Sequence, residues 1–355
     1  MRPIAARIHL GALRRNLEAV KARAPRSRVW AVVKANAYGH GLRRAARALQ
    51  GADGLALLEL EAAVELRAAG ETRPLLLLEG FFSPKELPLI AANGLTAVVH
   101  SLEQVAMLEK TRLDRPIAVY LKLNTGMNRL GLEAADFGIA LSRLRACGCS
   151  GEIVLMTHFA HAEGPEGIRR QMERFDAAAA GTGLPRSLAN SAAVLGFPES
   201  HADWVRPGIM LYGCSPFPDR SAESLGLSPV MTLVSEIIAV RNLEAGERIG
   251  YGWAFTAPAP MRVGVVACGY ADGYPRHAPT GTPIMVGGKR TRTVGRVSMD
   301  MLFADLTGIP TAAVGSTVIL WGDRVSADEV AASAGTVSYE LLCGLGQRVP
   351  VSEIE

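Results

Sequence analysis

Strand-like and helical segments alternate along the first 210 residues of this chain, and the alternation repeats eight times. The strand-like segments are nearly continuous in apolar residues, as parallel strands covered on both faces are. They span residues 29–35, 54–60, 74–80, 96–100, 117–124, 152–160, 186–191 and 204–213. Eight such units predict a TIM-type (β/α)8 barrel of the α/β class. An open, doubly wound sheet shows the same periodicity and stays an alternative.

The pattern changes near Ser228. Beyond this residue, strand-like runs follow one another without helices and are separated by turns such as residues 244–246 and 286–288. One helix is expected after Ser326, a residue type that often caps helix N-termini. We therefore predict a barrel over residues 1–227 and a mainly antiparallel β-domain over residues 228–355.

The composition excludes several classes of partner. The 355 residues include 38 Lys and Arg and 34 Asp and Glu, and the net charge of +4 is spread along the chain. The most basic run, residues 289–293, is too short to indicate nucleic-acid binding. No apolar run reaches the roughly 18 residues of a membrane span, and no secretory signal is evident. We expect a cytoplasmic protein without a nucleic-acid or membrane partner.

The cysteines and histidines do not indicate a metal site. Five cysteines occur at irregular spacings, so we expect neither a zinc site nor a disulfide framework. His158 and His161 follow the sixth strand, but positions three apart at a strand end do not share a face. His158 is better interpreted as a structural residue or one that faces a cofactor.

Lys34 ends the first predicted strand, in the segment VVKANAYGHG. Barrel enzymes build their sites at the carboxyl ends of the strands. Burial lowers the pKa of a lysine, and such a lysine can form a Schiff base with an aldehyde. Alternatively, the side chain extends from the barrel rim into water. Asn36, Tyr38 and His40 place further polar groups at this strand end, which favours a functional site.

The ends of the later strands carry residues suited to anions. Ser191 follows the seventh strand and Gly208 the eighth, and barrels often bind phosphate with these two loops. Arg206 would then face the ring that carries the phosphate. Arg129 follows the fifth strand and offers a planar fork for a carboxylate, although a surface loop with Lys122 and Arg129 gives the same pattern.

Three segments of the predicted β-domain stand out. Tyr251 lies between two glycines, and its hydroxyl needs nearby positive charge to act as a base at neutral pH. A tyrosine packed in a strand is the alternative. The segments 269–276 and 294–301 are rich in glycine and expose tyrosine or polar backbone where a small substrate could be held.

Taken together, the motifs of this chain resemble those of the alanine racemase family. They occur in the family's order as VVKANAYGHG, LKLNTGMNRLG, THFA, ANSAA, RPGIMLYG, GYG, GYADGYPR and GRVSMDM. The stretch VRPGIMLYGCSP resembles the catabolic-type enzymes of Gram-negative bacteria. The resemblance implies a pyridoxal 5'-phosphate enzyme that interconverts L- and D-alanine, for cell-wall D-alanine supply, alanine catabolism or both.

The resemblance also implies residue roles. Lys34 corresponds to the lysine that binds the cofactor and serves as the base on the D-alanine side, and Tyr251 to the base on the L-alanine side. Arg206 corresponds to the partner of the pyridine nitrogen and His158 to a residue beside the ring. The implied phosphate contacts are Tyr38, Ser191, Gly208 and Ile209.

The implied substrate residues are Arg129, Tyr270, Met299 and Asp300, with Lys122 as a carbamylated lysine that holds Arg129. The resemblance further implies a homodimer with shared active sites, in which Tyr251 is supplied by the partner subunit. No metal is implied.

This sequence departs from the family at three positions. Gln347 stands where many members have a phosphate-binding tyrosine, and Asn124 and Asn128 replace Asp and Gly. Two rival functions share parts of this plan: a pyridoxal-phosphate amino-acid decarboxylase and a non-catalytic carrier of the cofactor. The residues around Tyr251 and the RPGI motif favour the racemase.

Overall fold

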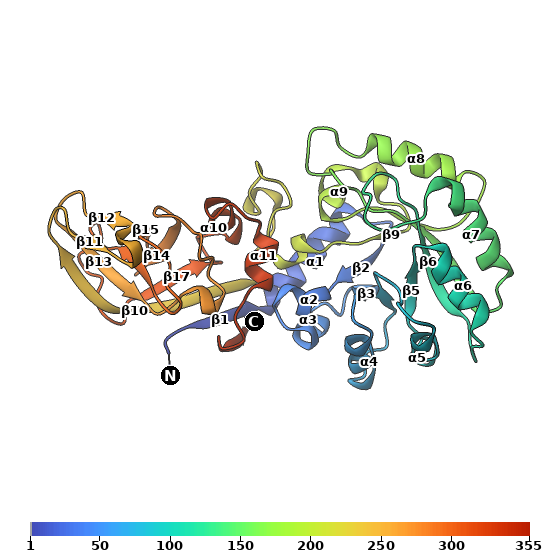
Figure 1. Cartoon of the computed structure of the whole chain (residues 1–355), viewed down its shortest axis with the longest axis horizontal. Coiled ribbons are helices and arrows are strands. Elements are labelled where there is room, and N and C mark those ends of the chain that lie inside the picture. The colour runs from blue at the N-terminus through green and yellow to red at the C-terminus, as the bar shows by residue number, and fades with distance from the viewer. Residues whose placement is uncertain (1) are drawn as a thin grey trace.

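The computed structural model describes residues 2–355 and contains a closed barrel of eight parallel strands (Figure 1). The last barrel strand pairs with the first, with Arg28 opposite Trp204, so the sheet is closed rather than open. The strands are β2 (Arg28–Val32), β3 (Gly54–Leu57), β4 (Leu75–Leu77), β5 (Thr96–Val99), β6 (Ile117–Lys122), β7 (Ser150–Met156), β8 (Arg186–Ser187) and β9 (Trp204–Val205). The prediction of a (β/α)8 barrel is confirmed.

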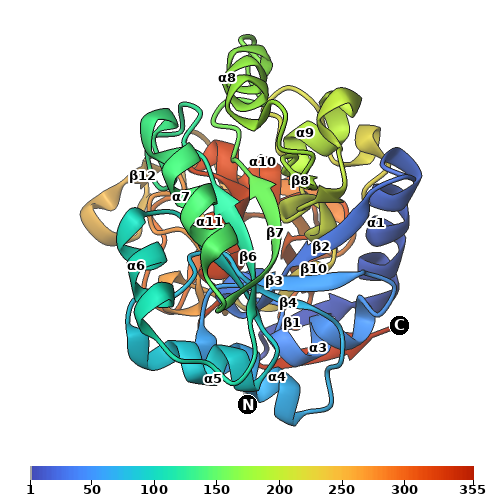
Figure 2. The same ribbon diagram turned by 90° about the vertical axis from the view of Figure 1, so that its right-hand side faces the viewer.

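Helices surround the barrel on its outside (Figure 2). The first two after β2 are the short α2 (Lys34–Tyr38) and α3 (Leu42–Ala48). The others are α1 (Leu10–Arg23), α4 (Leu60–Ala68), α5 (Leu87–Ala92), α6 (Leu102–Lys110), α7 (Ala134–Ala146), α8 (Arg169–Ala179) and α9 (Ser191–Gly196). Side-chain oxygens cap two of them: Ser101 accepts from Gln104 N at α6, and Asn190 accepts from Ala193 N at α9.

An eight-stranded, mainly antiparallel sheet forms the second part of the molecule, as predicted. Its strand order is β13-β16-β15-β14-β17-β10-β1-β18, and the ribbon β11-β12 is separate. The strands are β10 (Met231–Leu243), β11 (Arg248–Ile249), β12 (Phe255–Thr256), β13 (Met261–Val266), β14 (Pro283–Val286), β15 (Lys289–Val294), β16 (Leu302–Asp305) and β17 (Thr317–Trp321). Ser326 caps α10 (Ala327–Ser333) in a capping box with Glu329, which confirms the predicted helix start.

Both ends of the chain lie in this second sheet. Strand β1 (Ala5–His9) pairs antiparallel with β10 and parallel with β18 (Val351–Ile354). Residues 5–9 therefore lie outside the barrel, whereas the sequence analysis placed them in the barrel domain. Apolar periodicity can identify a strand but not the strands with which it pairs. The pairing of β1 with β10 and β18 could therefore not be predicted from the sequence.

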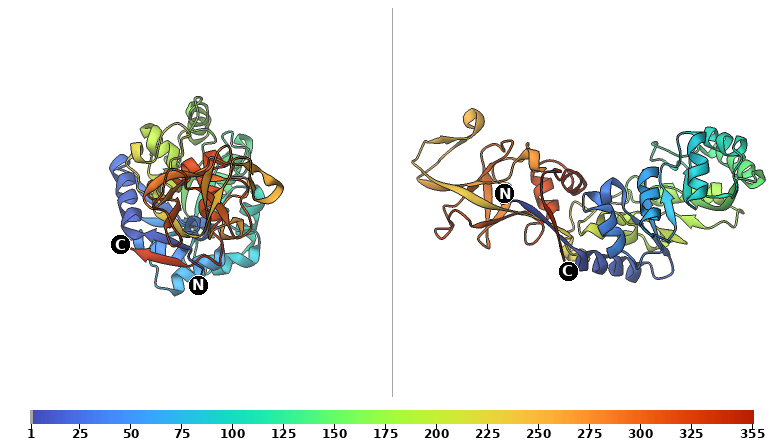
Figure 3. Two further views of the ribbon diagram at one scale, coloured as in Figure 1. Left: turned by 90° about the vertical axis from the view of Figure 1, so that its left-hand side faces the viewer. Right: turned by 90° about the horizontal axis from the view of Figure 1, so that it is seen from below.

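The two parts lie end to end along the long axis of the molecule (Figure 3). They meet where α11 (Ser338–Cys343) packs against α2. Gly39 allows this approach, because a Cβ at this position would overlap the Leu342 carbonyl oxygen. The second part thus touches the barrel at its Lys34 end. No helix within residues 2–355 is long and apolar enough to cross a membrane.

Candidate active site

Lys34 is half-buried and directly precedes a strained turn at the carboxyl end of β2. The four residues 35–38 have φ angles between 51° and 55°, so they form a left-handed turn without any glycine. For such residues this conformation costs about 1–2 kcal/mol each. Strain of this size is kept where the surrounding structure and the function require it. The turn carries Lys34 at its start and Tyr38 at its end.

The four predicted phosphate contacts lie together beside this turn. Ser191 Oγ accepts hydrogen bonds from Gly208 N at 2.9 Å and Met210 N at 3.4 Å. A Cβ at position 208 would overlap the Tyr38 hydroxyl oxygen, so the glycine brings the Tyr38 hydroxyl close to the backbone that continues into Ile209. Burial raises the pKa of Tyr38, and its hydroxyl therefore stays a neutral donor.

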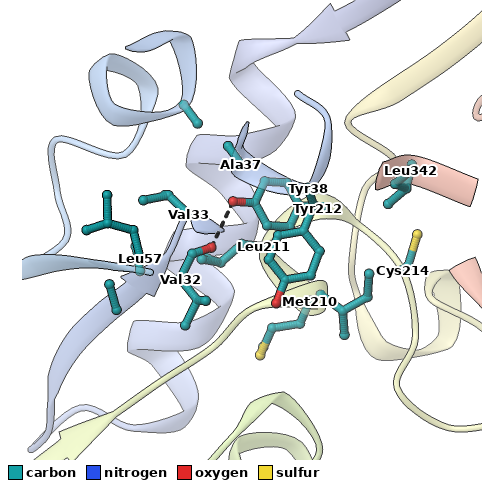
Figure 4. Packing of buried hydrophobic residues seen from close by; sticks show 14 of the residues in the cluster. Val32, Val33, Ala37, Tyr38, Leu57, Met210, Leu211, Tyr212, Cys214 and Leu342 are labelled. Atoms are coloured by element: carbon teal, nitrogen blue, oxygen red, sulfur yellow. Dashed lines mark hydrogen bonds between the residues drawn. The ribbon is translucent and has the colours of Figure 1, made fainter. Parts of the chain in front are cut away.

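Tyr38 is held in place by aromatic neighbours. Its ring stacks on Tyr212 with the ring centroids 4.6 Å apart, and Tyr212 Oη donates to the Val32 carbonyl at 2.8 Å (Figure 4). The ring of Tyr339, on α11, lies 6.0 Å from that of Tyr38. This packing connects the end of β2, the loop after β9 and the second part of the molecule.

Arg206 is buried inside the barrel mouth. Nη1 donates to Ser187 Oγ at 2.8 Å, and Nη2 donates to the Thr157 carbonyl at 2.6 Å and the Leu188 carbonyl at 3.2 Å. Burial lowers the pKa of Arg206 to about 10, so it remains protonated at neutral pH. No residue from 2 to 355 accepts a hydrogen bond from its Nε. This N–H group is therefore available to donate a hydrogen bond to a bound ligand.

Four cations gather around His158. The pKa of His158 is lowered well below its usual value, first by burial and then by the positive charges of Arg206, Lys122, Arg129 and Lys34. The imidazole is therefore neutral at pH 7. Four positive charges at one end of the barrel favour the binding of an anionic ligand, such as a phosphate or a carboxylate.

Lys122 is a buried member of this group, with 6% of its surface exposed. Burial and then the positive charges of Arg206 and Arg129 lower the pKa of Lys122 to about 8, against the opposing effect of Glu79. About a tenth of this lysine is therefore an uncharged amine at pH 7, and about half at pH 8.

Arg129 follows a loop organised by Asn124 and Asn128. Asn124 Oδ1 accepts from Gly126 N at 3.1 Å and Asn128 N at 3.0 Å, and its Nδ2 donates to Asn128 Oδ1 at 2.9 Å. Asn128 has a φ of 55°, a conformation that asparagine tolerates better than most residues. Asn128 thus adopts a left-handed backbone conformation in which glycine is the most common residue.

The remaining candidates lie in the second part of the molecule. Tyr251 is 72% exposed, in a short turn (η5, Tyr251–Trp253) between β11 and β12. This hairpin projects at the end of the molecule that is far from α2, so one chain does not bring Tyr251 to Lys34 (Figure 1). Tyr270 and Met299 are also exposed, and Asp300 Oδ1 accepts from Arg348 Nη2 at 2.6 Å.

Family models cover nearly the whole chain. The N-terminal domain of alanine racemase matches residues 8–216, and the C-terminal domain of alanine racemase matches residues 230–352. The chain belongs to the alanine racemase family. Members of this family depend on pyridoxal phosphate.

Alanine racemases of known name or structure match over the full length. The alanine racemase of Nitrosospira multiformis is 58% identical over 98% of both chains. A catabolic alanine racemase from Klebsiella aerogenes is 55% identical over 99% of both. The crystal structure of the biosynthetic alanine racemase from Pseudomonas aeruginosa superposes with a TM-score of 0.97 over 100% of both chains, at 46% identity.

Two tyrosines near Tyr38 were missed by the sequence analysis. Tyr212 lies four residues after Gly208 in the RPGIMLYG motif, so the motif itself was the available signal. Tyr339 had no such signal, because only the fold of the chain brings α11 to α2. Gln347 is exposed, and Tyr339 is the α11 tyrosine that lies beside Tyr38.

Proposed function

We propose that this protein interconverts L- and D-alanine with pyridoxal 5'-phosphate held by Lys34. The observation that carries the proposal is the arrangement at the barrel mouth. Lys34 belongs to a group of four cations around His158. The hydroxyl of Tyr38 lies close to Gly208, and Nε of the buried Arg206 has no acceptor on the chain. These features fit a ligand that has both an anionic group and a ring acceptor.

Each part of the cofactor has matching residues on this chain. Tyr38, Ser191 and the backbone of Gly208 and Ile209 bind the phosphate. Arg206 would donate its free Nε–H to the pyridine nitrogen and would keep its own proton, so that nitrogen would stay unprotonated. Neutral His158 lies beside the ring. When bound, the cofactor withdraws electrons from Cα of the amino acid.

Two bases act on opposite faces of Cα. A single base cannot easily remove a proton on one face and return it on the other, so Lys34 serves the D-alanine side and Tyr251 the L-alanine side. A tyrosine needs nearby positive charge to lose its proton near neutral pH. The cations around His158 provide such an environment at the barrel mouth.

A second copy of the chain brings Tyr251 to this mouth. Tyr251 and Trp253 are 72% and 68% exposed on a projecting hairpin, far from Lys34 of their own chain. A homodimer in which each hairpin enters the partner's barrel mouth covers both side chains and completes two shared sites.

The substrate carboxylate binds Arg129, and Lys122 positions that arginine. The neutral amine of Lys122, whose pKa is about 8, forms an N–C bond to carbon dioxide and releases one proton to solvent, which leaves a negatively charged carbamate. The negative carbamate then balances the surrounding cations and accepts hydrogen bonds from Arg129. Tyr270, Met299 and Asp300 border the route of the substrate and restrict its size.

In the cell, the enzyme works in the cytoplasm and supplies D-alanine as a peptidoglycan precursor, contributes to alanine catabolism, or does both. Relatives of both types, one named catabolic and one named biosynthetic, resemble it over the full length. Its partners are alanine and a second copy of itself, with no nucleic acid or membrane involved.

A chiral assay of the purified protein tests this function. L-Alanine, L-serine and L-lysine are each incubated with it, and both enantiomers are quantified while absorbance reports the bound cofactor. We expect racemisation of alanine. Release of carbon dioxide from lysine without racemisation identifies a decarboxylase instead, and bound cofactor with no reaction identifies a carrier.

A further inference from the structure

His40 is fully buried and lies directly behind the left-handed turn that follows Lys34. Its Nδ1 is 3.0 Å from the Ala37 carbonyl oxygen and 2.8 Å from the Tyr38 carbonyl oxygen. Its ring lies against Tyr212, with the ring centroids 4.7 Å apart. His40 thus contacts the last two residues of the turn and the aromatic ring on which Tyr38 stacks.

The surroundings of the ring determine which nitrogen carries the proton. Both neighbours of Nδ1 are carbonyl oxygens, which only accept hydrogen bonds, so Nδ1 must be the donor. Burial lowers the pKa of His40 to about 4, so the ring carries one proton at neutral pH. Nε2 is then an unprotonated acceptor, and it has no partner among residues 2–355.

Burying Nε2 of His40 without a hydrogen-bond partner lowers the stability of the fold, so the buried ring should have a role that offsets this loss. The turn supplies that role, because its non-glycine residues all adopt a conformation that they otherwise avoid. The backbone N–H groups of residues 37, 39, 40 and 41 already donate to carbonyl oxygens of residues 33, 35, 37 and 36. Here the Nδ1–H of His40 adds a bond to the exit of the turn.

We propose that His40 is a positioning residue whose Nδ1–H fixes the left-handed turn and thereby presents Lys34 and Tyr38 to the cofactor. Arg44 supports the same end of the turn, because its Nη1 donates to the His40 carbonyl at 2.6 Å. The part of this inference that concerns the cofactor rests on the proposed function, whereas the part that concerns the turn does not.

Two amide variants test the role of Nδ1. In His40→Asn the side-chain NH2 reaches the position of Nδ1, whereas in His40→Gln it reaches toward Nε2. Hydrogen exchange of residues 33–41 is measured by mass spectrometry on the full-length protein, with and without added pyridoxal phosphate. We expect exchange about tenfold faster in His40→Gln than in His40→Asn, the factor for one lost hydrogen bond. Affinity for pyridoxal phosphate, read from absorbance, should fall by a similar factor.

His201→Asn is the matched control. His201 is also buried and bonded to a carbonyl through one ring nitrogen, from Nε2 to Val194 O at 3.1 Å, but it does not touch the turn. Exchange of residues 33–41 should be unchanged in this variant. Equal exchange in the two His40 variants, or equally fast exchange in the control, would overturn the proposal. Failure to racemise alanine with the expected exchange pattern would refute only the proposed function.

Discussion

The surroundings of Lys122 change the protonation of its amine. Its burial among Arg206 and Arg129 leaves the amine partly uncharged, with a pKa of about 8. Only the neutral amine adds carbon dioxide, so carbamate formation should rise as the pH increases from 6 to 8. We expect a carbamate signal in the 13C NMR spectrum of protein equilibrated with 13C-bicarbonate, stronger at pH 8 than at pH 6.

Lys122→Arg serves as its control, because arginine keeps the charge and does not form the adduct. The signal should be absent from this variant, and activity should fall through poorer positioning of Arg129. A signal of equal strength in Lys122→Arg would show that another amine reacts, and its absence from the unmodified protein at pH 8 would refute the carbamate.

At this scale, part of the site could be predicted from the sequence. Lys34, Ser191 and Arg206 were expected together because each follows the carboxyl end of a predicted barrel strand. In the structure they lie at or after the carboxyl ends of β2, β8 and β9. The left-handed turn could not be predicted, because Ala35 and Ala37 are ordinary helix formers and only the surrounding packing forces their φ angles positive. Tyr339 and Tyr38 are 301 positions apart in the sequence, so local sequence patterns give no sign of their contact.

Among the structural elements, the loop after β9 packs closely against the turn that follows β2. Gly208→Ala adds a methyl group where the Tyr38 hydroxyl lies, so either Tyr38 or the backbone must shift. We expect the affinity for pyridoxal phosphate to fall at least about tenfold and the free energy of unfolding to fall by about 1–3 kcal/mol. Absorbance titration and urea denaturation measure the two effects.

Gly138→Ala is the comparison for this variant. Gly138 lies inside helix α7, and a Cβ there meets no atom within 4 Å. Alanine should increase the free energy of unfolding by about 0.5–1 kcal/mol and leave cofactor affinity unchanged. If both variants changed cofactor affinity equally, the close approach of Gly208 to Tyr38 would not explain the effect.

Apolar runs located the barrel strands well, because buried parallel strands leave a continuous signal. Strand β4, for example, is three buried leucines within the expected run 74–80. Strand β1 was not among the strands expected from the sequence, for a different reason. Its alternating burial pattern is that of a sheet strand, yet its partners β10 and β18 lie more than 200 residues away in the sequence.

Across the whole molecule, Asp272 connects residues near both ends of the chain to the segments around Gly269 and Asp300. Its fully buried carboxylate accepts from Arg2 Nη1 and Arg348 Nε, each at 2.7 Å, and from Gly269 N at 2.9 Å. Arg348 also binds Asp300 at 2.6 Å. Burial alone would raise the pKa of Asp272, but these donors hold it below its usual value.

This network makes stability depend on acid. A carboxyl with a lowered folded pKa contributes stability that is complete above its unfolded pKa of about 3.9 and is lost as the pH falls through the folded value. Asp272→Asn should lose about 1–3 kcal/mol of unfolding free energy at pH 7 and show a shallower decline below pH 4, measured by urea denaturation. An unchanged acid profile in the variant would assign that decline to other carboxyls.

The proposed active site, formed by Lys34 of one subunit and Tyr251 of the other, is tested most directly by mixing two inactive variants. Lys34→Ala and Tyr251→Phe proteins, each inactive or nearly so, are mixed in equal amounts under conditions where native mass spectrometry shows subunit exchange. Half of the dimers are then mixed, and each mixed dimer has one intact site, so activity should recover to about a quarter of the unmodified level. No recovery despite demonstrated exchange would contradict an active site that joins Lys34 of one subunit to Tyr251 of the other.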